Sequence, residues 1–553
     1  MKRAAEAGEI LRLGRRHDNV LRAQAIRDLL RSGSVDPRGI LVVGARVAGA
    51  LDLDFISTST ALQLDDCVFE EPLSMHDTEL PALSLDGSTL PGLHAENLRT
   101  RYLTMRGTRC TGIVDLENAR IDGSLLLSGA TAMPLFATGL HVSRSVQADR
   151  LYASRVWLDS CDIGGEVYLH EAVIVSEDGL ALVANNATIG GDLNLNNAFV
   201  KASGDSAAVL LTDATARNLR MSGAVLRSAA GTALLLDGAQ FLHEVRLNAF
   251  DARSNGADTV RMVDTHIGAG LVVNGSVRND HGQAFVLHRT KVGASITITN
   301  ATIESNSRLS TVDLMDAVVN GELVIESSEL VNRRRGHELE LSGTKVGNLL
   351  SLGEEELVEA PWFSLALDGL TYPNQPQETD VWLRMLRDHT FTYEAQPYQQ
   401  LAAVHRAAGH EHTARKVLIA QQRDLRRRGD PGNKLWHWFL GVTLGYGYKP
   451  SRAVAGLLVT FVLALCLVWT TNAYNGLAPA KDRGPDACSP VNRISLAADL
   501  AIPLVKLGGT PRCELANGPA GQWATGAGWV VQILGWSFAT LSVAGFTGLV
   551  RKS

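Results

Sequence analysis

Apolar and polar residues alternate in short runs along the middle of this chain. Within residues 165–169, and again within residues 191–195, every second position is apolar or glycine. Such alternation over a few residues is typical of a short β-strand with one buried face. Glycine pairs such as Gly164-Gly165 precede several runs, which suits tight corners and disfavours a helix. The pattern therefore predicts short strands joined by sharp turns.

These runs form two interleaved series, each with a period of about 26 residues. The first series is anchored at Val167, Leu193, Leu219, Val245, Leu271, Ile296, Leu323 and Leu350, and the second at Leu182, Val209, Leu234, Val260, Phe285, Val312 and Leu339. A fixed period of this length indicates a repeat architecture, in which each unit buries its apolar edge by stacking on its neighbours. We predict a mainly β fold, a β-solenoid with two short strands per coil.

The earlier coils are shorter than the later ones. From Leu103 to Val167 the apolar anchors return every 10 or 11 residues. Two such strands make a coil of about 21 residues, so the later coils of about 26 residues need longer corners. We place these corners at residues 176–179 and 203–206.

Helical patterns flank the solenoid at both ends. Residues 18–32 predict a capping helix, because terminal coils must hide their apolar edge from other chains. We expect Asp18 to be its N-cap and Gly33 to end it. Its apolar face would consist of Leu21, Ala25, Leu29 and Leu30. Beyond the solenoid, residues 397–428 predict a helical hairpin that breaks at Gly409. The expected domains are a capping region (1–36), the solenoid (37–353), a helical adaptor (354–434) and a membrane region (435–553).

Two long apolar runs predict membrane-spanning helices at about residues 453–471 and 528–550. Arginines at residues 423–428 precede the first run, and Arg551 and Lys552 follow the second. Positive residues favour the cytoplasmic side, and the chain does not begin with the apolar core of a signal peptide. We therefore expect a multi-pass plasma-membrane protein with a cytoplasmic solenoid and C-terminus, and with an outer loop at residues 472–523.

Residues near the two runs are expected to contact lipid and to pack the helices together. An interfacial aromatic belt is predicted from Trp436, Trp438, Phe439, Tyr446 and Tyr448. Residues 443–447 resemble a potassium-channel filter, but they precede the first run, so we interpret them as a juxtamembrane turn. Small residues on the two helices would allow close helix contact and the formation of a homo-oligomer. These residues are Gly456, Gly535 and Ala539.

The outer loop carries two features with chemical consequences. Cys488 and Cys513 are the cysteine pair expected on the oxidising side, and a disulfide there would stabilise the loop by about 3 kcal/mol. Residues 494–507 are too short and polar for a third span, and they favour either an interfacial segment or a re-entrant one. In a re-entrant segment, Pro503 and Lys506 would lie beside a pore.

Composition excludes several functional classes. The chain has 553 residues, a net charge of −6 and 45% hydrophobic residues, so nothing indicates a nucleic-acid partner. We find no P-loop, no nucleophile elbow and no C-x-x-C spacing, and we expect no catalytic residue, metal or cofactor. His405, His410 and His412 lack the spacing of a metal-binding helix. Acidic residues on the coils, such as Asp192, are expected on a solvated face.

Four short motifs are spread over the chain. They are Pro-Arg-Gly-Ile at residues 37–40, the coil at residues 45–53, Gly-Tyr-Gly-Tyr-Lys-Pro at residues 445–450 and Leu-Gly-Trp at residues 534–536. Together they resemble a group of actinobacterial membrane-anchored proteins with pentapeptide-repeat-like solenoids. Such proteins are often labelled membrane-associated oxidoreductase, which implies a redox cofactor. The resemblance covers nearly the whole chain but maps no catalytic residue onto it.

Three functions from different classes follow. The first is an interaction scaffold or sensor, with an unknown protein partner on the solenoid face and a membrane anchor. The second is an oligomeric ion-conducting or membrane-perturbing effector that the solenoid regulates. The third is the oxidoreductase that the resemblance implies.

Overall fold

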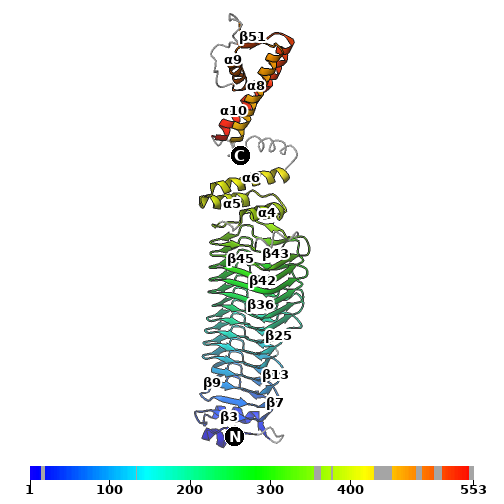
Figure 1. Ribbon diagram of the computed structural model, residues 1–553. Helices are drawn as coiled ribbons and strands as arrows, with labels where there is room; N and C mark the ends of the chain where they lie inside the picture. The colour runs from blue at the N-terminus through cyan, green and yellow to red at the C-terminus, as the bar shows by residue number, and fades with distance from the viewer. Residues whose placement is uncertain are drawn as a thin grey trace. The chain divides into compact units, whose positions relative to one another are not determined.

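The computed structural model describes residues 1–13, 19–132, 134–353, 363–374, 378–428, 451–480, 488–502 and 513–546. The chain divides into two compact units, residues 1–400 and 401–553. The first unit is a β-solenoid whose short strands stack coil upon coil (Figure 1). The predicted mainly β solenoid fold is therefore confirmed.

Each complete coil passes through four parallel ladders, which we number 1 to 4 in chain order. Ladder 1 holds the first predicted series: β1 (Leu11–Arg12), β3 (Ile40–Val43), β6 (Leu62–Asp65), β9 (Glu79–Ser84), β12 (Arg99–Thr104), β16 (Leu125–Leu126), β20 (Val146–Gln147), β24 (Val167–Tyr168), β28 (Leu193–Asn194), β32 (Leu219–Arg220), β36 (Val245–Ser254), β39 (Leu271–Asn279), β42 (Ile296–Ser305), β45 (Leu323–Glu326) and β49 (Leu350–Ser351). Ladder 3 holds the second series: β5 (Leu51–Asp52), β8 (Leu73–Ser74), β11 (Leu93–His94), β14 (Val114–Asp115), β18 (Leu135–Phe136), β22 (Val156–Trp157), β26 (Leu182–Val183), β30 (Val209–Leu210), β34 (Leu234–Leu235), β37 (Asp258–Arg261), β40 (Gln283–Val286), β43 (Ser310–Asp313), β47 (His337–Glu340) and β50 (Leu365–Ala366).

Two further ladders were not predicted. Ladder 2 contains β2 (Val20–Arg22), β4 (Arg46–Ala48), β7 (Val68–Phe69), β10 (Thr89–Leu90), β13 (Arg109–Cys110), β17 (Thr131–Ala132), β21 (Tyr152–Ala153), β25 (Val173–Val175), β29 (Phe199–Ala202), β33 (Val225–Ser228), the second halves of β36, β39 and β42, and β46 (Glu329–Asn332). Ladder 4 contains the first halves of β9 and β12, then β15 (Arg120–Ile121), β19 (His141–Val142), β23 (Asp162–Ile163), β27 (Thr188–Ile189), β31 (Thr215–Ala216), β35 (Gln240–Phe241), β38 (His266–Ile267), β41 (Lys291–Val292), β44 (Val318–Val319) and β48 (Lys345–Val346). Most of these strands bury a single side chain, so they produce no alternation in the sequence.

Left-handed residues make the turns that follow ladders 1 and 3. Asn197 has a φ of 56° after β28, and Asn186 has a φ of 53° after β26. Asn, Asp and Gly adopt this conformation at the lowest cost. In the next coil Gly223 aligns with Asn197, where a Cβ atom would lie 2.2 Å from the Asn197 Oδ1 atom. The stacking of coils therefore selects glycine at that position.

The longer corners of the later coils lie between ladders 2 and 3. In an early coil β17 ends at Ala132 and β18 begins at Leu135, whereas later β25 ends at Val175 and β26 begins at Leu182. The next coil has the same insertion between β29 and β30. Residues 176–179 and 203–206 therefore form the predicted long corners.

Helices close both ends of the solenoid. At the first end, α1 (Lys2–Ala7) precedes β1, and α2 (Ala23–Ser32) follows β2 and stops at Gly33 in the left-handed conformation as predicted. The predicted N-cap Asp18 lies outside the described residues, and the helix begins later than predicted: Leu21 lies in β2, Ala25 is exposed, and Ile26 is buried in its place. The α2 helix packs on β5, where the Arg27 Nη1 atom donates to the Asp52 carbonyl at 2.7 Å. After β50, α4 (Thr379–Asp388) buries Trp382 against Tyr372.

The helical hairpin is also confirmed. It consists of α5 (Gln396–Ala407) and α6 (Glu411–Arg428), and Gly409 between them has a φ of 81°. Side chains on one face of each helix are buried: Tyr398, Leu401, Ala402, His405, Ala414, Val417, Leu418 and Gln421. The chain then continues through α8 (Ser451–Ala473), β51 (Leu477–Pro479), α9 (Pro490–Ala501), β52 (Cys513–Leu515) and α10 (Pro519–Phe546).

Candidate functional site

Two helices of the described chain are long and apolar enough to cross a membrane. They are α8 and the part of α10 from Pro519 to Val543. The second helix begins earlier than the predicted residue 528, because residues 519–527 are small or uncharged and continue the helix. The predicted belt residues Trp436, Trp438, Phe439, Tyr446 and Tyr448 lie outside the described residues.

Small residues bring α8 and α10 into close contact. A Cβ atom on Gly456 would lie 2.5 Å from the Phe538 ring, so only glycine fits there without a shift. Gly535 and Ala539 on α10 are also buried. Gly456 therefore packs the chain's own helix pair, and the part of all three residues in a homo-oligomer stays a prediction.

The short helix α9 packs beside this pair. Ala497 and Ala501 of α9 form one apolar cluster with Ala464 and Val468 of α8 and Val531 of α10. Ala464 lies well inside α8, about 13 Å before its last residue at the helical rise of 1.5 Å per residue. The side of α9 thus contacts the middle of α8. Pro503 and Lys506 lie outside the described residues.

A disulfide joins the two ends of the segment that contains α9. Cys488 is bonded to Cys513, with Cα atoms 5.1 Å apart. Cys513 also begins β52, which pairs antiparallel with β51 through Pro479. The segment is therefore closed at its base by one covalent bond and a short sheet.

We expect a Cys488→Ser variant to lose this crosslink. Alkylation after denaturation should add two more labels to the reduced wild type than to the unreduced one, and intact mass measures the difference. In Cys488→Ser, reduction should release no further thiol. The loop-closure model gives a loss of about 3 kcal/mol in the stability of this segment. Cys466→Ser, at a free cysteine of α8, is the matched control and should keep the reducible pair; equal labelling of wild type with and without reduction would contradict the bond.

A buried polar cluster lies on ladder 3. The Asp313 carboxylate accepts from Gln283 Nε2 at 3.0 Å and from Ser310 Oγ at 2.9 Å, and His288 Nε2 lies 2.8 Å away. The Asp313 side chain is only 5% exposed. One carboxylate thus holds together side chains from β40, β43 and the turn after β40.

The cluster shifts two pKa values in opposite directions. The hydrogen bond to Asp313 raises the pKa of His288. Burial acts to raise the pKa of Asp313, but hydrogen bonds from His288, Met315 and Ser310 outweigh it, so that pKa is lowered. Charged His288 therefore stabilises the folded state, and this contribution is fully present below its unfolded pKa near 6.5. Charged Asp313 does the same above its unfolded pKa near 3.9.

We expect the stability of the solenoid to fall as the pH rises through the raised pKa of His288. The stabilisation from the pair should be greatest between about pH 4 and 6.5, because both groups are charged there. In His288→Gln this decline should flatten, since glutamine keeps a donor but does not titrate. Urea unfolding of both proteins at several pH values measures the difference; parallel pH profiles would contradict the role of His288.

Acidic residues of the coils form ion pairs with arginines of the next coil. Asp192 pairs with Arg220 at 2.8 Å, and Asp264 pairs with Arg289 at 2.6 Å. The sequence placed such residues on a solvated face but did not reveal their partners, because each partner lies one coil away.

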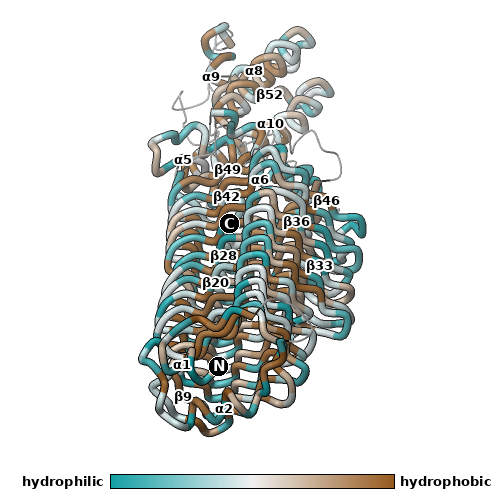
Figure 2. The backbone as a smooth tube through the Cα atoms, turned by 90° about the horizontal axis from the view of Figure 1, so that it is seen from below, coloured by the Kyte–Doolittle hydropathy of each residue, from teal (hydrophilic) through white to brown (hydrophobic). Residues whose placement is uncertain are grey.

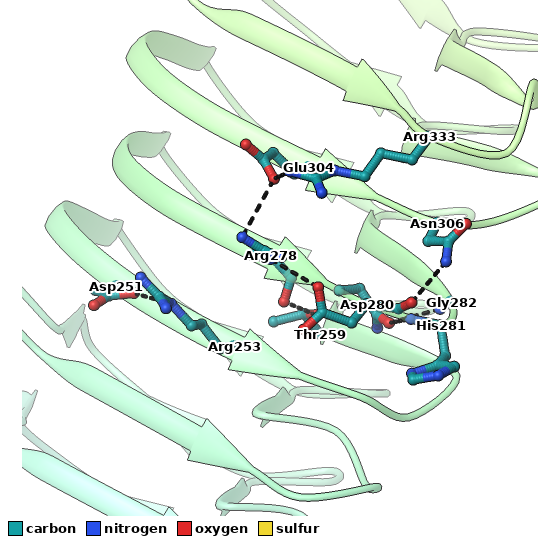
Figure 3. Close-up of polar contacts among 11 residues, drawn as sticks. Asp251, Arg253, Thr259, Arg278, Asp280, His281, Gly282, Glu304, Asn306 and Arg333 are labelled. Atoms are coloured by element: carbon teal, nitrogen blue, oxygen red, sulfur yellow. Dashed lines mark hydrogen bonds and ion pairs between the residues drawn. The ribbon is translucent and has the colours of Figure 1, made fainter.

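Charged side chains also meet along the corner between ladders 2 and 3 (Figure 3). Glu304 on β42 accepts from Arg333 at 2.6 Å and lies 3.7 Å from Arg278 on β39. Arg278 pairs in addition with Asp280, whose carbonyl accepts from Asn306 at 2.8 Å. The corner is thus a continuous polar edge that crosses several coils.

Three observations on the described residues bear on metal binding and redox chemistry. Among them no three His, Cys, Asp or Glu residues gather to hold a metal ion. Burial raises the pKa of the Cys161 thiol to about 12, so it is no nucleophile at neutral pH. Phe250 and Phe285, each at most 1% exposed, fill the interior of their coils. The residues of these coils do not fit a redox cofactor, and we assign them no redox step.

Comparisons of the chain with protein-family models, curated proteins and solved structures found no match. The function therefore has to be argued from the geometry.

Proposed function

We propose that this protein is a cytoplasmic β-solenoid that is tethered to the plasma membrane and acts as a protein-interaction scaffold. The supporting observation is a 14-stranded ladder in one unit and two helices with the length and apolarity of membrane spans in the other. A stack of coils gives a long, regular surface, as repeat proteins use for binding. The anchor would hold that surface at the membrane.

One stretch of ladder 3 suits a protein partner best. Leu210 and Leu235, which follow the buried anchors Val209 and Leu234, are only partly buried. Earlier coils place Phe136 and Trp157 at the aligned positions, with ring centroids 4.9 Å apart, while Val183 in the coil between Trp157 and Leu210 is buried. Aromatic and apolar side chains of this kind dominate the energetics of protein interfaces. We call Phe136, Trp157, Leu210 and Leu235 the apolar stripe.

A photo-crosslinking amino acid at position 157 tests this proposal in native membranes. We expect a discrete crosslinked product there, and we expect it to disappear when Leu210→Asp is added. The matched control is position 152 on ladder 2, because Tyr152 is 47% exposed but lies outside the apolar stripe. Equal products at both positions, or none at 157, would count against a partner on this surface.

A second function is supported by the packing of α9 against the pair of span-length helices. A short helix that contacts the middle of a spanning helix has the arrangement of a re-entrant segment, which is tolerated in membranes where protein surrounds it. An oligomer of such units would conduct ions. Planar-bilayer recordings of the purified chain separate the two functions, because a scaffold gives no current and a channel gives one that Lys506 variants alter.

A further inference from the structure

The long corners between ladders 2 and 3 change charge along the chain. The corner loops at residues 176–181 and 203–208 carry only acidic charges: Glu177, Asp178 and Asp205. The loops at residues 229–233 and 255–257 carry no charge, and the loop at residues 280–282 carries Asp280, which pairs with Arg278. The last two loops that the structure describes between ladders 2 and 3, residues 306–309 and 333–336, carry four arginines and no acidic residue. Because the loops stack on one another, the arginines of the last two described loops lie next to each other at this corner.

The two basic loops form one continuous surface. The Arg333 amide donates to the Ser305 carbonyl at 2.9 Å, and a Cβ atom on Gly336 would lie 2.0 Å from the Leu309 carbonyl. Arg333 is paired with Glu304, but Arg308, Arg334 and Arg335 are exposed and form no ion pair within the described residues. Figure 2 shows the hydrophilic loops of this corner beside β46. Within the part of the chain that the structure describes, these three exposed guanidinium groups therefore lack a counter-charge.

Two large apolar side chains lie at the same corner. Leu309 is 63% exposed and Phe391 is 59% exposed. His337 connects them, because its amide donates to the Leu309 carbonyl at 2.7 Å and its ring centroid lies 4.6 Å from that of Phe391. We call Arg308, Leu309, Arg334, Arg335 and Phe391 the basic corner patch.

We propose that the basic corner patch binds the headgroup region of an anionic phospholipid bilayer. The inference depends on the membrane tether proposed above. Arginines beside an anionic leaflet are each worth about 1 kcal/mol, and exposed leucine and phenylalanine enter the boundary between headgroups and acyl chains. Exposed leucine and phenylalanine beside unpaired arginines favour a surface with both anionic headgroups and an apolar layer, as a bilayer has. Residues 392–450 alone separate the patch from α8 along the chain, so the protein's own bilayer is the nearest anionic surface in sequence.

Headgroup quenching of a fluorophore tests this contact in the full chain. A Leu309→Cys variant in a Cys466→Ser background is labelled with an apolar dye and placed in lipid nanodiscs that contain a nitroxide headgroup lipid. The discs are phosphatidylcholine alone, or phosphatidylcholine with about a third phosphatidylglycerol. The matched control is Phe55→Cys, because Phe55 is 77% exposed and lies in an early coil with no such loop.

We expect strong quenching at position 309 in the anionic discs, weak quenching in the neutral discs and none at position 55. Replacing Arg308, Arg334 and Arg335 by alanine should weaken docking about fivefold for each arginine removed. Equal signals in both kinds of disc, or a triple variant that is quenched like its parent, would overturn the lipid contact. A chain that elutes without the disc would instead contradict the tether, and this separates the two failures.

Discussion

Replacing Phe285 by alanine should destabilise the solenoid by about 3–5 kcal/mol. Phe285 on ladder 3 is fully buried and is among the largest buried side chains of the coils. Its neighbours in the ladder, Val260 and Val312, are held by strand pairing and cannot move to fill the space. Because each coil is stabilised only by adjacent coils, the cavity weakens two interfaces at once. Urea unfolding of the full chain, followed by the β-sheet circular dichroism signal, measures the effect.

Phe55→Ala is the matched control for this experiment. The same side chain is removed, but Phe55 is 77% exposed, so the change in unfolding free energy should stay within about 0.5 kcal/mol. A loss below about 1 kcal/mol for Phe285→Ala, or equal losses for both variants, would contradict the close-packed solenoid interior.

Replacing Ala464 by arginine should strongly reduce membrane integration. Ala464 is fully buried in the contact of α8 with α9, and it lies near the centre of the predicted span. A central arginine costs about 2.5–3.5 kcal/mol on insertion scales, and the larger side chain also displaces α9. The fraction of the chain that resists alkaline carbonate extraction measures the change.

Tyr474→Arg supplies the comparison, because Tyr474 follows the last residue of α8 and is 77% exposed. A charge at that level reaches the aqueous interface, so extraction should match the wild type. If Ala464→Arg were extracted no more than Tyr474→Arg, α8 would not be a membrane span.

The sequence predicted those parts of the solenoid that repeat with a period. Leu193 and Phe285 recur at fixed spacing because every coil buries the same positions, and this period survives in the sequence. Val142 and Ile163 of ladder 4 were not assigned to strands, since a strand with a single buried residue leaves no alternation. The start of α2 was also misplaced, because strand pairing of Leu21 with Val47 overrides its helical spacing.

The pairing of polar and cysteine side chains could be predicted only where few candidate partners existed. Cys488 and Cys513 were the two cysteines of the expected outer loop, so one disulfide pairing was available there. The contact between His288 and Asp313 joins adjacent coils, and nothing in a single sequence selects that pair from many. Arg308 and Arg334 are ordinary surface residues until the coils stack their loops together. Such sites depend on the register between the strands of adjacent coils, which the sequence pattern defines only approximately.

Flotation of the chain with lipid vesicles tests the central claim, a β-solenoid held at a bilayer by its C-terminal helices. The full chain is compared with a chain that ends at Arg428, after α6 and before α8. We predict that the full chain floats with the vesicles at high salt, and that the truncated chain stays in the dense fraction with its β-sheet circular dichroism spectrum unchanged. A full chain that remains soluble without detergent, or a truncated chain that floats as well at high salt, would contradict the account.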